Sequence, residues 1–425
     1  MKKSIRFLFC VFLLTILAST TILAQIELIL WDHQTEAEPG HEMIKDAIAR
    51  FEADHPGVKI RHVPTKNDSY KVKLQVAMAA NDEPDIFMTW GGGGLKSYVD
   101  AGKVYDMTDM LVNSGYINRF IPAGIGTVSF DGRHYGVPVI SISGAFFGYR
   151  PSMFEKYGVE VPETWEELVE VAQVFIDNGV IPFALANATK WTGSLYYMYL
   201  VDRIGGPETF QKAFNREGSF TDEPFIKAGE MIQDLVRMGA FPKGVNGLRE
   251  DQGQARMLLY TERAAMYLML QSAYSLMKSE NPAVAEELDI FRFPMVEGGK
   301  GNPTNLIGSA GNNYYSISNK CKHKELAFKF LQYITDDKAQ EMLVKSGAMP
   351  PTVGTDRLLD DEVNIKMYQF FSEAEYVQLY YDQTLPPELA EVHKDTMHGL
   401  FGLTMTPEEV ANTLEEAARK YYNED

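Results

Sequence analysis

Cysteine is almost absent from this chain of 425 residues, in which only Cys10 and Cys321 occur. Basic residues are also in deficit: 40 Lys and Arg stand against 58 Asp and Glu, which gives a formal net charge of −18. A chain this acidic repels nucleic acid and anionic lipid, and no cluster of Lys and Arg reverses the charge locally. Beyond the first residues, no apolar run is long enough to span a membrane. These absences exclude a disulfide-rich scaffold, a nucleic-acid-binding protein and a multi-span membrane protein.

The N-terminal segment has the three parts of a secretory signal. Three basic residues are followed by an almost wholly apolar run from Phe7 to Leu17, and small or polar residues then lead to Ala24. The run is shorter than the ~20 residues of a membrane-spanning helix. We therefore predict that residues 1–24 are a signal peptide, cleaved after Ala24, and that the product is periplasmic or extracellular. A short uncleaved anchor is the alternative; Cys10 lacks the small residues that precede a lipoprotein cysteine.

After this segment the chain alternates between strand and helix patterns, and its length predicts two or three domains. The expected elements, by residue number, are strand 26–31, helix 39–54, strand 58–63, helix 67–80, strand 85–90 and a short helix that ends at 101. This order predicts an α/β fold with a parallel sheet. Such sheets bind ligands beyond the carboxyl ends of their strands, and two of these ends carry Trp31 and Trp90.

Five segments of the chain resemble, in order, those of a known family. They are ARFEADHPGVKIRHV, EPDIFMTWGGGGLKSYVDAGKVYDMTDML, DGRHYGVPV, GYRPSMFEKYGVEVPETWEELVEVAQ and IGSAGNNYYSISNKCKHKELAFKFLQYIT. The chain resembles the extracellular solute-binding proteins of ABC sugar importers, the maltose-binding type. It departs from the family pattern at Arg150, where Asn is more usual, and at Gln271 and Ser272, where related proteins often place Gly and Trp.

This resemblance implies a two-lobed fold of the type II periplasmic binding proteins. Each lobe is expected to be a mainly parallel sheet flanked by helices, and the lobes close on a sugar in the cleft between them. We predict that residues 25–138 and 308–348 form the N-terminal lobe, and that 139–307 and 349–425 form the C-terminal lobe. The implied partners are a carbohydrate, expected to be a neutral oligosaccharide of about two to four units, and the membrane permease of an ABC transporter. We expect the protein to be a monomer.

Trp90 is the first candidate for contact with the sugar. Sugars have apolar C–H faces, on which flat rings stack, and polar rims, which planar polar side chains bind. Gly91 and Gly92 follow Trp90 directly, and their bare backbone would allow a ligand to approach closely. The alternatives are a core tryptophan beside a turn, or a phosphate-binding loop, for which the usual glycine spacing is missing.

Trp31 ends the first predicted strand, and a polar loop follows it. Among the loop residues, His33, Gln34 and Glu36 are candidates for binding sugar hydroxyls. Asn67, at the corresponding end of the second strand, is a further candidate. The alternatives are that Trp31 packs in the core, that the loop is only solvated, and that Asn67 only caps a helix.

The C-terminal lobe supplies candidates chiefly through the resemblance. In similar sugar-binding proteins an aromatic residue at the place of Trp191 stacks from the second lobe, and Tyr196 follows on the same predicted helix. Gln271 lies where a strand leads into a helix at the cleft. Ser309 and Asn312 follow the second predicted crossing between lobes. The alternative for the tyrosine is a core position with its hydroxyl satisfied.

Chemistry beyond binding finds little support in the sequence. The histidines match no zinc-binding spacing, and no nucleophile elbow occurs, so we predict no catalytic residue, no metal and no cofactor. Carboxylates are abundant, which leaves a secreted glycoside-processing enzyme as an alternative. A binding protein for another solute, such as a polyamine, a peptide or a sugar alcohol, is the other alternative.

Overall fold

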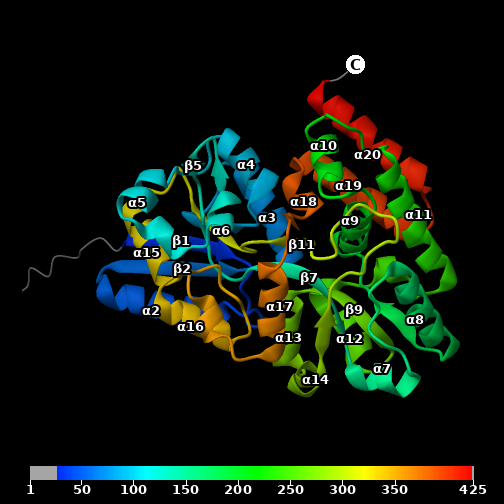
Figure 1. Ribbon diagram of the computed structural model, residues 1–425. Helices are drawn as coiled ribbons and strands as arrows, with labels where there is room; N and C mark the ends of the chain where they lie inside the picture. The colour runs from blue at the N-terminus through cyan, green and yellow to red at the C-terminus, as the bar shows by residue number, and fades with distance from the viewer. Residues whose placement is uncertain (1–25, 424–425) are drawn as a thin grey trace, which may run out of the picture.

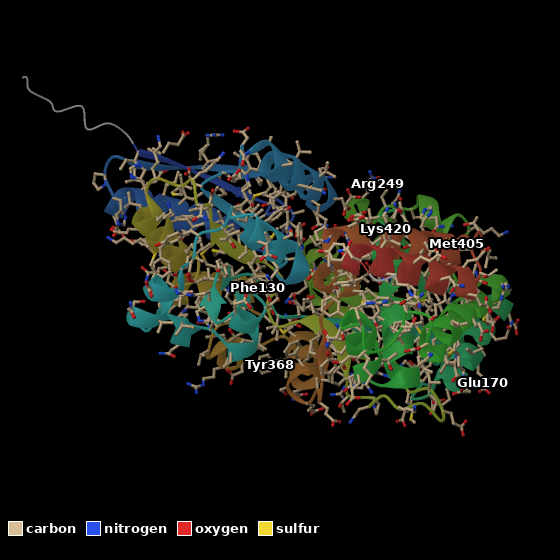
Figure 2. All side chains as sticks on the ribbon, turned by 90° about the horizontal axis from the view of Figure 1, so that it is seen from above. Phe130, Glu170, Arg249, Tyr368, Met405 and Lys420 are labelled. Carbon is tan, nitrogen blue, oxygen red and sulfur yellow. The ribbon has the colours of Figure 1, made fainter. Side chains whose placement is uncertain are left out.

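The computed structural model of the protein describes residues 26–423. It consists of two α/β lobes that lie side by side (Figure 1), so the predicted two-lobed fold is confirmed. Seen from above, Phe130 lies on the first lobe, and Glu170 and Met405 lie on the second (Figure 2). The predicted signal peptide, residues 1–24, lies outside the described residues.

The first lobe is built on a five-stranded sheet in the order β2-β1-β3-β12-β6. Its strands are β1 (Ile26–Asp32), β2 (Val58–Pro64), β3 (Ile86–Thr89), β6 (Val137–Pro138) and β12 (Tyr314–Ile317). Helices of the early chain and of a later segment pack around this sheet, and α15 and α16 contact α2. These helices are α2 (His41–Asp54), α3 (Asn67–Ala80), α4 (Gly92–Asp100), α15 (Lys324–Tyr333) and α16 (Asp337–Lys345).

The second lobe is built on a sheet in the order β13-β11-β7-β9-β8, with β10 paired to β7. Its strands are β7 (Ser143–Tyr149), β8 (Ile181–Ala184), β9 (Ala264–Leu270), β10 (Asp289–Phe291), β11 (Leu306–Ser309) and β13 (Val377–Gln378). Every residue of β7 and nearly all of β9 is buried, because both faces of this sheet are covered. Such strands read as continuous apolar runs rather than as alternating ones.

Both sheets are mixed, so the expectation of mainly parallel sheets is wrong in this detail. In the first sheet β1 is parallel to β2 and β3, whereas β12 runs antiparallel to β3 and β6. In the second sheet β7 runs antiparallel to β9, β10 and β11. A parallel pair needs a helical crossover on its own sheet. Strands that enter from the other lobe have no such crossover and here run in the opposite direction.

The remaining elements complete the two lobes and their rims. In the first lobe they are α5 (Thr108–Asn113), η1 (Tyr116–Arg119), α6 (Pro122–Gly126), β4 (Ser129–Phe130) and β5 (Arg133–His134). In the second lobe they are α7 (Pro151–Tyr157), α8 (Trp165–Asp177), α9 (Trp191–Gly205), α10 (Glu208–Phe214), α11 (Glu223–Met238), η2 (Val245–Gly247), η3 (Glu250–Gln252), α12 (Gln254–Tyr260), α13 (Gln271–Glu280), α14 (Pro282–Glu287), α17 (Glu362–Ser372), α18 (Tyr381–Thr384), α19 (Pro387–Phe401) and α20 (Pro407–Tyr422). The short η4 (Thr355–Leu358) packs against α16 of the first lobe.

Three chain segments connect the two sheets, and they hydrogen-bond to one another. They follow β6, β11 and α16 respectively. The backbone bonds that join them run from Val139 N to Asn313 O (2.9 Å), from Asn312 N to Ser141 O (2.7 Å) and from Ile142 N to Met349 O (2.7 Å). Residues 139–142, 312–313 and 349 of the three segments are therefore joined by hydrogen bonds at the base of the cleft between the lobes. We call these hydrogen-bonded residues the strap. The predicted residue limits of the lobes remain a prediction.

Helix starts follow from local sequence, as α8 illustrates. The hydroxyl of Thr164 accepts a hydrogen bond from the backbone N–H of Glu167, and the Glu167 carboxylate accepts one from the backbone N–H of Thr164. This reciprocal capping satisfies donors that a helix start otherwise leaves unpaired. Across residues 26–423, no helix combines the length and apolar character that crossing a membrane requires.

Candidate binding site

A cavity of about 380 Å³ lies between the two lobes. The first lobe contributes the loop after β1, the start of α3 and the end of β3. The second lobe contributes the start of α9, η3, the β9–α13 junction and α18, and the connecting segments form the base. The volume lies in the range of small-molecule sites, and the place is the one expected for a sheet whose strands end at a cleft.

Seven of the thirteen predicted site residues line this cavity. They are His33, Gln34, Asn67, Trp90, Trp191, Gln271 and Asn312. The structure thus brings together residues that lie as far apart in the sequence as His33 and Asn312. The other six lie outside the lining that the described residues form: Trp31, Glu36, Gly91, Gly92, Tyr196 and Ser309. Ligand contact by any of the thirteen remains a prediction.

The loop after β1 presents two polar side chains with free hydrogen-bonding capacity. The ring of His33 lies parallel to that of Trp90, with centroids 6.1 Å apart and an interplanar angle of 2°. The amide of Asn313 donates to Nε2 of His33 (2.7 Å), so Nδ1 carries the proton of the neutral ring. Within residues 26–423 that Nδ1 and the Nε2 of Gln34 have no partner, although both side chains are buried. Two donors are therefore available at the cavity.

Asp32 fixes this loop from beneath. Its carboxylate is fully buried and accepts hydrogen bonds from the backbone N–H of Gln34 (2.9 Å), from Nε2 of His62 (2.8 Å) and from the hydroxyl of Tyr315 (3.0 Å). The bonds come from β2, from β12 and from the loop itself. A buried carboxylate with several donors is rigidly held, so Asp32 anchors the loop to β2 and β12.

Trp90 and Trp191 approach the cavity from opposite lobes, with Lys71 between them. The ammonium of Lys71 lies 4.9 Å from the ring centroid of Trp90 and 6.0 Å from that of Trp191. It also lies 4.0 Å from the carboxylate of Asp382 on α18. A cation at these distances is attracted by both aromatic faces. Lys71, from α3, therefore connects the two lobes across the cavity.

An ion cluster occupies the second-lobe wall. Arg256 binds Glu250 (2.8 Å) through Nη1 and holds both oxygens of Glu280 (2.9 Å each) through Nη2 and Nε. The hydroxyl of Tyr267 donates to the same oxygen of Glu250 (2.6 Å). The second carboxylate oxygen of Glu250 has no partner among the described residues. Burial raises the pKa of Glu250 to about 7, against the opposing effect of Arg256.

Further carboxyls face the cavity from both lobes. Burial raises the pKa of Glu38 in the first lobe, while His33 and Arg256 act in the opposite direction. Burial and the charge of Asp251 raise the pKa of Asp68, and Lys71 and Arg249 oppose the rise. Arg249 lies on the side of the second lobe that is turned toward the first (Figure 2). The site therefore contains several carboxyl groups with raised pKa values, and a negatively charged ligand placed beside them would be destabilised.

The raised pKa of Glu250 predicts a pH dependence of stability. Between about pH 4.5 and pH 7 the folded protein retains a proton that the unfolded chain releases, so this residue's contribution to stability is lost as the pH rises through that window. Glu250→Gln, which cannot titrate, should lack this decline. Urea unfolding at pH 5 and pH 7 measures it. Glu160→Gln, at an exposed position, is the control and should keep the wild-type pH dependence; an equal decline in Glu250→Gln would contradict the assignment.

Four of the six outlying residues have structural roles or lie at the surface. Trp31 packs against the first-lobe core, with Nζ of Lys73 3.9 Å from its ring centroid. Tyr196 is fully buried among second-lobe aromatics such as Phe241. The hydroxyl of Ser309 is engaged by Gly311 O (2.6 Å) and Tyr314 (3.1 Å). Glu36 is exposed on the surface loop.

Gln271 lines the cavity, but its amide is already engaged. Its Oε1 accepts from the hydroxyl of Ser141 (2.9 Å), and its Nε2 donates to Ser275 (3.0 Å) and to the carbonyl of Gly347. These bonds connect the start of α13 to two of the segments that join the lobes. We expect Gln271 to stabilise the strap rather than to bind the ligand.

Gly91 and Gly92 have a role that the sequence did not reveal. Both have a positive φ, 73° and 57°. A Cβ on Gly91 would meet Thr127 and Tyr314, and one on Gly92 would meet the backbone of Gln383. Their missing side chains thus make room for the protein's own chain at this point.

The sequence pattern did not indicate four charged residues of the cavity, Lys71, Glu250, Arg256 and Glu280. Lys71 stands four residues after Asn67, so helical spacing could have placed it on the same face of α3. Arg256, Glu250 and Glu280 carry no comparable signal, because only the fold brings η3, α12 and α13 together. In the part of the chain that the structure describes, no group of three or more His, Cys, Asp or Glu side chains could hold a metal ion.

Comparisons with known proteins agree with this architecture. The family described as bacterial extracellular solute-binding protein matches residues 34–341. The chain is 26% identical over 318 residues to the multiple sugar-binding protein of Streptococcus mutans serotype c, covering 73% of this chain and 72% of that protein.

Two solved structures extend the comparison to nearly the whole chain. One, described under xylan utilization by the thermophilic bacterium Caldanaerobius polysaccharolyticus, is 31% identical, with a TM-score of 0.85, and the match covers 92% of this chain and 99% of that one. The other, a chitin oligosaccharide binding protein, has a TM-score of 0.84 at 21% identity over 93% of this chain and 98% of that one. The second likeness shows the fold alone.

Proposed function

The chain belongs to the bacterial extracellular solute-binding proteins, and from this premise we propose that it binds a neutral oligosaccharide between its lobes and delivers it to the permease of an ABC transporter. Two relatives support the carbohydrate class: one is named as a multiple sugar-binding protein, and the other, at 31% identity, is described under xylan utilization.

One observation carries the proposal: tryptophans from the two lobes face one cavity whose walls hold unpaired polar atoms. Trp90 comes from the first lobe and Trp191 from the second. Among residues 26–423, buried side-chain atoms that lack a partner at this cavity are His33 Nδ1, Gln34 Nε2, Trp191 Nε1, Glu250 Oε2 and Gln383 Oε1. Leaving such atoms unpaired is costly. A sugar would stack its apolar faces on the rings and pair its hydroxyls with these donors and acceptors.

The charges of the cavity favour a neutral ligand. Six acidic side chains and three basic ones line it. Of the bases, Arg256 is held by Glu250 and Glu280, and Lys71 lies beside Asp382. A ligand carboxylate, sulfate or phosphate would therefore meet a surplus of carboxylates. Sugar hydroxyls, in contrast, donate hydrogen bonds that stabilise a buried carboxylate.

The proposed mechanism is closure of the lobes about the strap at the base of the cleft. In the open state the sugar enters, and contacts from both lobes then favour the closed state. The permease would recognise the closed form. We propose that the protein acts as a monomeric receptor outside the cytoplasm, after removal of residues 1–24, and that it carries out no catalysis.

A thermal-shift screen tests the proposal. The chain without residues 1–24 is screened against neutral mono- to tetrasaccharides, with uronate-bearing oligosaccharides, polyamines and amino acids as controls. A ligand at a hundredfold excess over its Kd adds about 2.7 kcal/mol to stability. We expect one neutral oligosaccharide series to raise the Tm and its uronate-bearing counterparts to raise it less. A rise with polyamines alone would refute the proposal.

A further inference from the structure

The start of α4 touches the backbone of the other lobe. A Cβ on Gly93 would lie 2.6 Å from the carbonyl oxygen of Thr384 and 2.8 Å from that of Leu385. A Cβ on Gly92 would collide with the carbonyl oxygen of Gln383. Backbone carbonyls cannot swing aside as a flexible side chain can. Only glycine fits this contact as it stands.

The two sides of this contact belong to different lobes. Helix α4 follows β3 of the first sheet, and its Leu95 is buried in the first-lobe core. The opposing segment, which includes α18, places Tyr381 and Leu385 in the second-lobe core and packs on α19. Helices α4 and α18 are direct neighbours across the lobe boundary. A change in the angle between the lobes would therefore separate or compress this contact.

The contact also borders the cavity on both sides. Trp90 lines the cavity two residues before Gly92, while Tyr380, Asp382 and Gln383 line it from the opposing segment. The glycines themselves lie outside the lining that the described residues form. Their contact with the opposing segment limits how closely the lobes can approach around the cavity.

We propose that Gly93 is a positioning residue for ligand binding: because it has no side chain, the backbone of residues 383–385 can contact helix α4 directly when the lobes close. This inference rests on the proposed function. With glycine at position 93 the lobes approach until backbone meets backbone, which brings Trp90 and Trp191 to their closed positions around the cavity. Any side chain there holds the lobes apart and weakens ligand binding, although the side chain touches no ligand.

The run of glycines supplies a matched pair of variants. Gly93 and Gly94 both lie within helix α4 and lack the positive φ of Gly91 and Gly92. Alanine is therefore compatible with the backbone at both positions and favours the helix over glycine. A Cβ on Gly94 meets no described atom within 4 Å. Gly94→Ala thus makes the same chemical change without reaching the other lobe.

The test compares Gly93→Ala with Gly94→Ala in three measurements. These are the Tm without ligand, the affinity for the neutral oligosaccharide that raises the wild-type Tm most, and the radius of gyration from small-angle X-ray scattering with and without it. We expect Gly94→Ala to behave as wild type. Gly93→Ala should keep a Tm close to that of Gly94→Ala, bind about tenfold or more weakly, and become less compact with ligand than wild type does.

Two outcomes would overturn the proposal. Equal affinity and equal compaction of the two variants would show that the contact at Gly93 does not limit how far the lobes close. A ligand-free Tm of Gly93→Ala far below that of Gly94→Ala would show that the contact is a permanent part of the fold. If the wild type binds no sugar, the proposed function fails, and the two variants are then compared with whichever other screened solute raises the wild-type Tm. Weaker binding of that solute by Gly93→Ala than by Gly94→Ala supports the role of Gly93, and equal affinity refutes it.

Discussion

Replacing both Trp90 and Trp191 by alanine is expected to remove most of the affinity for oligosaccharide while leaving the protein folded. Both rings are only partly buried, and each packs against the core of its own lobe from the edge. Burial of a large apolar side chain is worth about 1.5–3 kcal/mol, so each truncation should weaken binding by ~10- to 150-fold. The double variant should lose at least as much as the worse single variant.

The two effects are not expected to be additive. Lys71 lies near both rings and beside Asp382, so removal of one ring changes the surroundings of the other. Titration calorimetry of the two single variants and the double variant measures the coupling. Trp31→Ala is the matched control, because it makes the same truncation at a partly buried tryptophan that lies outside the cavity lining of the described chain. A folded double variant with wild-type affinity would refute the placement of the site.

Replacing Arg203 by methionine is expected to destabilise the protein by about 3–5 kcal/mol. Arg203 is buried near the end of α9 and binds the Asp202 carboxylate (2.5 Å). Its Nη2 also donates to the carbonyl oxygens of Phe293 (3.2 Å), Pro303 (3.2 Å) and Asn305 (3.0 Å). Burial lowers the pKa of Arg203 and raises that of Asp202, while each opposes the shift of the other.

The methionine variant leaves Asp202 as a buried charge without its main partner and frees the loop between β10 and β11. Urea unfolding at neutral pH measures the loss. Arg237→Met is the control, because Arg237 pairs with Asp234 at the surface and such pairs contribute about 0–1 kcal/mol. Equal stability of the two variants would contradict the stabilising role of Arg203.

The early elements of the chain could be predicted closely from the sequence. Strand β1 and helices α2 and α3 lie within two residues of their expected limits, because β1 is a short apolar-rich run, α2 carries an apolar stripe at helical spacing, and a clear end signal follows each helix. Trp90 was predictable for a similar reason: it follows a short buried strand directly. The mixed character of the sheets was not predictable in this way, since it depends on strands that arrive from the other lobe.

Within the site, the sequence pattern could not predict which residues face the cavity where this depends on burial or on tertiary contacts. Helix α9 is buried on nearly all sides, so helical spacing could not show that Trp191 faces the cavity while Tyr196 faces the core. The glycines after Trp90 indicated a close approach of backbone, but not whether to ligand or to protein. The cluster around Arg256 joins residues from three separate elements, which no local pattern reveals.

The central claim is that the interlobe cavity binds a neutral oligosaccharide, and a calorimetric titration tests it most directly. The chain without residues 1–24 is titrated at neutral pH with neutral oligosaccharides of about two to four units, each beside a uronate-bearing counterpart. We expect saturable binding of one neutral oligosaccharide per chain, and weaker binding of its acidic counterpart. Saturable binding of an acidic sugar or a polyamine, with none for any neutral oligosaccharide, would contradict it.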